Sequence, residues 1–303
     1  MSPGRPAAIA ALALAAGVIG FMPILVRWSD AGPVATAFWR LALAAVVLIA
    51  MDSKGFLALA QARDRRLGWL AIAGALFGAD IALFGLALGR TSVANASVLN
   101  NLSPLFAGLI ALVLWRPPSR SFWAGLAIAI GGVVMLFAEE MDSKVGIAGL
   151  AYGLLSAACF AGYLLLVARV RGELPTGQVL AWTTTFAALA LVPVPWMLGE
   201  ATAPTSSMGW VSVAALAVLV HCGGQALMVF ALSRAGGAEA GLIMMLQPVA
   251  AALLGWLLLG ESLTTLSAAG GLVVLAGLCT AILRADARQG SSSRAGTSAP
   301  ENT

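Results

Sequence analysis

Charged residues are scarce in this sequence. Only 10% of its 303 residues are Asp, Glu, Lys or Arg, whereas 60% are hydrophobic. A soluble domain carries about 25% charged residues, so a soluble globule of this size is excluded. The net charge of +4 does not indicate a nucleic-acid partner, because the basic residues lie in short loops between apolar blocks, where they act as topology signals.

Histidine, cysteine and catalytic motifs are also sparse. The chain has one histidine and three cysteines, and all three cysteines lie inside hydrophobic blocks. We therefore expect no disulfide framework, no metal site and no cofactor. The sequence lacks a Gly-rich phosphate loop, HExxH and GxSxG, and its loops are too short for a catalytic domain. These absences argue against an enzyme.

What the sequence has in abundance is apolar blocks of about 20 residues, the length that carries a helix across a bilayer. The blocks do not alternate as barrel strands do. The first block could pass for a signal peptide, but it is long and lacks a clean cleavage context, so we assign it as a span. The sequence predicts an all-α integral membrane protein with ten transmembrane helices at approximately 7–26, 33–51, 67–88, 92–115, 121–137, 146–168, 177–197, 209–232, 238–259 and 264–283.

Basic residues orient these spans. With the N-terminus in the cytoplasm, thirteen Lys and Arg residues fall in inside loops and three in outside loops. This asymmetry is the one that insertion machinery enforces. We predict a multi-pass protein of the plasma membrane, which is the inner membrane in a Gram-negative cell, with both termini cytoplasmic.

The chain contains an internal repeat. Residues 85–104 recur as 229–248, and the match includes Arg90 with Arg234 and Pro104 with Pro248. Because five spans lie in each half, the second copy must enter the membrane from the opposite side, and the repeat is inverted. We predict a first five-helix repeat at 1–140, a second at 141–284, and a disordered cytoplasmic tail at 285–303 that is polar and rich in Ser and Gly.

Two charged residues interrupt the spans at comparable depth, Arg40 in the second and Asp80 in the third. A lone charge there costs at least ~2.5 kcal/mol, so we predict an intramembrane charge pair, direct or through water. Asp80 is either a static partner or a group that exchanges a proton or contacts a cationic group of a substrate. Pro104 and Pro248, midway in spans 4 and 9, are either plain kinks or hinges beside a cavity.

Other polar side chains inside spans mark candidate cavity walls. Asn100 and Asn101 lie on span 4, and Ser156 and Cys159 share a face of span 6. His221 and Gln225, four residues apart on span 8, also share a face. Helix–helix hydrogen bonding, or a structural role for the lone histidine, is the alternative reading. The small-residue faces of spans 5 and 10 favour packing within the monomer over a dimer interface; they contain Gly125, Gly132, Gly270 and Gly277.

Taken together, these features resemble the EamA-type exporters of the drug/metabolite transporter superfamily. The resemblance rests on the ten-span inverted repeat, Arg40 in AFWRLALA, the two mid-span prolines, and LLLGESLT at 257–264. Two departures are WRPPS at 115–119, where the first half would carry a Gly-Glu turn, and VIGF in span 1, where many members have Trp-Gly. The first departure makes Glu261 a structural residue in this interpretation.

The resemblance implies secondary-active export of small amino-acid-like or amphipathic compounds by alternating access. It also implies a small-molecule substrate, protons as a candidate coupling ion, and a monomer or weak homodimer in the bilayer. An uptake permease of the same fold and a non-transporting helical component remain alternatives. On this basis the substrate-binding residues are Asp80, Asn100, Asn101, Ser156, Cys159, His221, Gln225 and Gln247.

Overall fold

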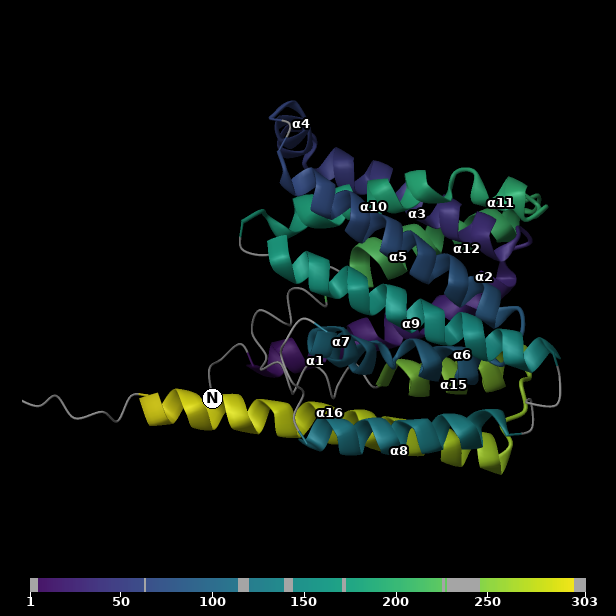
Figure 1. Cartoon of the computed structure of the whole chain (residues 1–303). Helices are drawn as coiled ribbons and strands as arrows, with labels where there is room; N and C mark the ends of the chain where they lie inside the picture. The colour runs from purple at the N-terminus through teal and green to yellow at the C-terminus, as the bar shows by residue number, and fades with distance from the viewer. Residues whose placement is uncertain are drawn as a thin grey trace, which may run out of the picture.

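The computed structural model describes residues 5–62, 64–113, 120–138, 144–170, 173–224, 227 and 246–296, and these form helices joined by short turns (Figure 1). Apolar composition and good helix formers such as Ala and Leu favour this outcome. The first repeat comprises α1 (Arg5–Gly20), α2 (Met22–Trp28), α3 (Pro33–Met51), α4 (Ser53–Gln61), α5 (Arg66–Leu88), α6 (Val93–Asn100), α7 (Ser103–Val113) and α8 (Arg120–Phe137). The second comprises α9 (Lys144–Val170), α10 (Thr176–Leu191), α11 (Val194–Met197), α12 (Ser207–Ala215), η1 (Leu216–Gly224), α15 (Leu246–Leu259) and α16 (Thr265–Gly296).

Ten apolar helical segments in the described part of the chain correspond to the ten predicted spans. Six are long and apolar enough to cross a bilayer, and four are shorter. Several spans consist of two consecutive helices, because α1 and α2 are separated at Phe21 and α6 and α7 at Asn101 and Leu102. The outer surface of the helices is apolar, with Leu257 and Leu272 more than two-thirds exposed, as expected for a surface that faces lipid.

Two elements were not expected. The short helix α4 lies in the loop between spans 2 and 3 and stands apart at one end of the molecule (Figure 1), where Asp52 caps it by accepting a hydrogen bond from Gly55 N at 3.0 Å. Helix α16 continues to Gly296, although the sequence predicted a disordered tail from 285. Residues such as Ala285, Ala287 and Arg288 are good helix formers and extend the helix beyond its apolar part.

The helix contacts follow the inverted repeat. Span 3 (α5) packs against span 6 (α9). The counterpart of this contact is the packing of span 8 (α12 and η1) against span 1 (α1 and α2). The contact of spans 4 and 6 matches that of spans 9 and 1, and the contact of spans 3 and 7 matches that of spans 8 and 2. Equivalent spans also pair directly: α3 with α10, α6 with α15, and α8 with α16. The fold is therefore two inverted five-helix repeats around a pseudo-two-fold axis.

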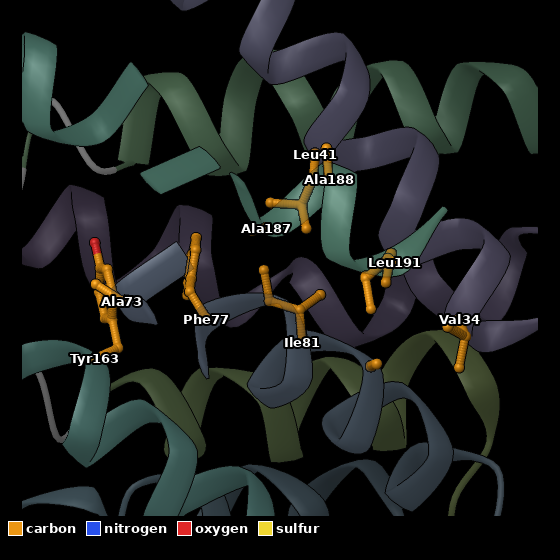
Figure 2. Close-up of a cluster of buried hydrophobic side chains, with 11 residues drawn as sticks. Val34, Leu41, Ala73, Phe77, Ile81, Tyr163, Ala187, Ala188 and Leu191 are labelled. Atoms are coloured by element: carbon orange, nitrogen blue, oxygen red, sulfur yellow. The ribbon is translucent and has the colours of Figure 1, made fainter. Parts of the chain in front are cut away.

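One core cluster joins both repeats through α3, α5, α9 and α10 (Figure 2). Phe77 and Tyr163 stack with their ring centroids 4.6 Å apart. Small residues such as Ala187 and Ala188 let the neighbouring helices approach the rings. This cluster packs α5 and α9 firmly against each other, and both helices carry residues of the candidate site.

The glycine faces of α8 and α16 pack against each other, and the two helices lie side by side along one edge of the molecule (Figure 1). A Cβ on Gly132 would lie 2.6 Å from Val274 N, and one on Gly277 would lie 2.6 Å from Ala129 N. No side chain fits at either contact without a shift of the backbone. The prediction that these glycines serve packing within the monomer is confirmed.

Candidate substrate cavity

Span 4 is broken at the repeat's shared proline. Helix α6 ends at Asn100, and α7 begins at Ser103 with Pro104 in its first turn. Proline is tolerated there because a first-turn N–H has no intrahelical acceptor. The side chain of Asn101 donates to Ser97 O at 2.8 Å and closes the end of α6. In the second repeat, Pro248 is buried in the first turn of α15. Residue 244, whose carbonyl is left without its helical N–H donor by this proline, lies outside the described residues.

Asp80, Asn100 and Ser156 form a closed triangle of hydrogen bonds between α5, α6 and α9. Asp80 Oδ1 accepts from Ser156 Oγ at 2.6 Å and from Asn100 Nδ2 at 2.9 Å. Asn100 Nδ2 also lies 2.8 Å from Ser156 Oγ. Asp80 and Ser156 are buried. The carboxylate is therefore held by two donors inside the bundle, as a buried acceptor requires.

Arg40 has other contacts than the predicted ones. Its Nη1 donates to Met22 Sδ at 2.8 Å, and no direct salt bridge joins Arg40 to Asp80 among the described residues. The two groups remain close enough to interact electrostatically. The direct form of the predicted pair is absent because Asp80 is held by Asn100 and Ser156, while a water-mediated contact stays a prediction.

Two cavities lie on either side of Phe84, which lines both. The central cavity, with room for a few water molecules in this conformation, is bordered by the broken ends of spans 1 and 4 and by α15. Its polar groups belong to Ser97, Asn100, Asn101 and Gln247. The Arg40 cavity, with room for about one water molecule in this conformation, lies between α3 and α5 and is otherwise lined mainly by apolar residues. Of the predicted site residues, Asn100, Asn101, Gln247 and Pro248 line the central cavity directly.

His221 lies away from these cavities. It is fully buried on η1, a π-helical segment, and its Nε2 lies 2.9 Å from Thr184 Oγ1. Its Nδ1 has no hydrogen-bond partner within the described ranges. Cys159 is half-buried on α9 and within electrostatic range of Asp80, but lines neither cavity. Gln225 lies outside the described residues.

Carboxylates from distant loops cap helices through contacts that the sequence did not reveal. Glu200 accepts from Val34 N and Ala35 N, both at 3.0 Å, and so caps α3. Glu261 accepts from Val93 N at 2.8 Å and lies 3.5 Å from Arg27, so it caps α6. The structural interpretation of Glu261 agrees with this geometry. The partners are more than 160 positions apart, and no local pattern could have predicted them.

A family comparison matches both repeats. The EamA-like transporter family matches residues 6–138 and again residues 147–283. The chain belongs to this family. Membership of the EamA-like transporters identifies it as a multi-pass membrane protein of a transporter family, and not of an enzyme family. In this member the carboxylate of the Gly-Glu turn at 260–261 has a visible structural role, because it holds the start of the broken span 4.

Two relatives are identical to the chain at about a quarter of the aligned positions. The uncharacterized transporter YwfM of Bacillus subtilis is 26% identical over 65% of this chain and 67% of its own length. The pseudopaline exporter CntI of Pseudomonas aeruginosa is 24% identical over 82% of this chain and 84% of its own length. A crystal structure of a protein with 20% identity matches with a TM-score of 0.61 over 93% of this chain and 99% of that one, which supports the fold.

Proposed function

We propose that the chain is a secondary-active exporter of small amino-acid-like or amphipathic metabolites, working by alternating access. The observation that carries this proposal is the broken span 4. Its polar end, at Asn100 and Asn101, borders the central cavity and also holds the buried carboxylate of Asp80. Broken helices whose ends meet at mid-membrane are typical of substrate sites in inverted-repeat transporters. A relative named as an exporter, CntI, supports the direction.

The proposed substrate site has the Asp80–Asn100–Ser156 triangle at its centre. Asn101 and Gln247 line the central cavity beside it, and Cys159, His221 and Gln225 are placed at its periphery. Asp80 is the candidate proton carrier or partner of a cationic substrate group, since it is the buried carboxylate nearest the cavity. The breaks next to Pro104 and Pro248 are the proposed flexing points. Replacing Pro104 with Ala would supply an N–H that allows α6 and α7 to join into one continuous helix, and it is expected to slow turnover in liposomes.

The arrangement in the membrane is proposed from the sequence. Residues 1–140 and 141–284 form the two repeats, both termini lie in the cytoplasm, and the protein works as a monomer or a weak homodimer. The glycine faces are used between α8 and α16, which removes the main candidate for a dimer interface. A green fluorescent protein fused to the C-terminus becomes fluorescent only on the cytoplasmic side and tests the orientation.

Transport by purified protein in liposomes tests the function. Counterflow of labelled amino acids and small amphipathic solutes is expected from the wild type and reduced at least ~10-fold by Asp80→Asn, because a buried charged acceptor is lost. Asp52→Asn is the matched control, since it changes an Asp that caps α4 outside the membrane and Asn caps equally well. Absence of flux for every solute would support a non-transporting component. Flux of Asp80→Asn with unchanged rate and pH dependence contradicts the proton role.

A further inference from the structure

Arg40 is a buried cation with little hydrogen bonding. Its side chain belongs to a residue that is only 5% exposed, and its Nε has no partner within the part of the chain that the structure describes. Its Nη1 donates to the thioether of Met22, and a thioether is a weak acceptor. A guanidinium has five donors, and a buried charge is costly unless it is paired. The group thus retains capacity for a stronger acceptor.

The cavity beside Arg40 offers such an acceptor a place. Its walls are mainly apolar side chains from α3, α5 and η1, together with Val26 of α2. Thr36 is its other polar side chain, and its hydroxyl is already 2.7 Å from Ser29 Oγ. No carboxylate of the described residues lines this cavity. Arg40 therefore gives this cavity a positive charge that no lining carboxylate balances. The apolar surroundings strengthen the attraction between the guanidinium and an anion.

The other titratable groups nearby do not neutralise Arg40 by direct contact. Asp80 is held by Asn100 and Ser156, and His221 is held by Thr184. Cys222, on η1, is within electrostatic range of Arg40 but forms no charge pair with it. Phe84 stands between the Arg40 cavity and the central cavity. Arg40 thus lines one of these two cavities, while Asp80 lines neither and is linked to the central cavity through Asn100.

We propose that the Arg40 cavity is a subsite for a carboxylate of the transported solute. The planar guanidinium can bind a carboxylate through two parallel hydrogen bonds. In this conformation the cavity has room for about one water molecule, so binding requires α3 and α5 to separate during the transport cycle, after which the apolar walls can accept the first carbons of the solute. A solute bound here would extend past Phe84 towards the central cavity, which Asn100 of the Asp80 cluster lines, and a movement of Asn100 would open Asp80 to a cationic group of the solute. The assignment rests on the proposed function, and it makes Arg40 a binding residue for an anionic group.

Thermal unfolding of the full chain in detergent tests the subsite with two probes of equal shape. The anion 4-methylpentanoate is expected to raise the unfolding midpoint in a concentration-dependent way, because it binds the folded state. Its neutral amide, 4-methylpentanamide, is expected to leave the midpoint unchanged. This comparison uses the wild type alone. Equal effects of acid and amide, or no effect of the acid, overturn the proposal.

Variants locate the effect. Arg40→Gln is expected to weaken the carboxylate effect at least ~10-fold, since a charged hydrogen bond is lost, and Arg40→Lys to retain part of it. Arg169→Gln is the matched control, because Arg169 lies over the Trp69 ring at 4.5 Å, away from both cavities. An undiminished carboxylate effect in Arg40→Gln overturns the proposal. If Arg40→Gln does not fold, Arg40→Lys and the wild-type comparison decide it.

Transport separates this proposal from the proposed function. In liposomes, counterflow by the wild type is expected to prefer an amino acid over its amide, and Arg40→Gln to lose that preference. Carboxylate binding in detergent without flux of any solute leaves the subsite standing and contradicts the transporter. Flux that is equal for acid and amide supports the transporter and overturns the subsite.

Discussion

At the scale of single residues, the closed triangle of Asp80, Asn100 and Ser156 links three helices through one carboxylate. Both donors point at the same oxygen, Oδ1, at 2.6 and 2.9 Å. Because Asn100 is also the last residue of α6, any movement of the break in span 4 changes the contacts of the carboxylate. The carboxylate proposed to bind a ligand and the proposed flexing point of span 4 are therefore neighbours.

Ser156→Ala tests the strength of this linkage. Removing the hydroxyl takes a hydrogen bond from a buried charged acceptor, so the free energy of unfolding is expected to fall by about 1.5–3 kcal/mol. Ser212 is the matched control, because its buried hydroxyl has no partner in the described part of the chain. Ser212→Ala is expected to be neutral or stabilising, as measured by denaturant titration in mixed micelles. A similar loss in both variants contradicts the linkage.

At the scale of elements, helix starts in one repeat are held by carboxylates from the other. Glu200 caps α3, and Asp30 accepts hydrogen bonds from Thr205 N and Ser206 N at the start of α12. Glu200 thus caps the helix after the other loop, and Asp30 holds the two residues before α12, whose cap is the Ser206 hydroxyl. The backbone N–H groups that bind Glu200 and Asp30 would otherwise lack an acceptor at the helix starts. These hydrogen bonds hold the two loops together.

The contact at Asp30 predicts a pH dependence. The Thr205 hydroxyl and the N–H groups of Thr205 and Ser206 donate to the carboxylate and hold the pKa of Asp30 at about 2, below its ordinary 3.8. A lowered folded-state pKa adds stability that is present above the ordinary pKa and is lost as pH falls through the folded value. The stability advantage of the wild type over Asp30→Asn is thus expected to shrink from pH 3.8 towards pH 2. A difference in unfolding midpoint that is constant with pH contradicts this.

The contact of α8 with α16 predicts a sharp difference between adjacent glycines. Gly132→Ala places a Cβ 2.6 Å from Val274 N, so it is expected to destabilise by about 1–3 kcal/mol through overpacking. Gly131→Ala meets nothing within 4 Å and is expected to be neutral or stabilising by up to about 1 kcal/mol. Denaturant titration of both variants measures the difference. Equal stabilities would show that the two helices separate freely.

At the scale of the whole molecule, hydropathy and loop charge are enough to predict the ten spans and the inverted repeat, because span length and loop charge can be read directly from the sequence. The glycine spacing also predicts the α8–α16 contact correctly. The partners of Arg40 and Glu200 could not be predicted, because they come from residues brought together by packing alone. The helix α4 and the π-helical η1 were missed for a different reason. Their residues have no period or composition that separates them from a loop or an α-helix.

The glycine contact also constrains how the protein is made. Helix α8 is complete at Phe137, but its partner begins at Thr265. During synthesis the first repeat must therefore wait in the bilayer with its glycine groove open to lipid until the last helix has been inserted. A chain that stops before α16 leaves that groove unfilled. Helix α16, made long after α8, thus closes the first half.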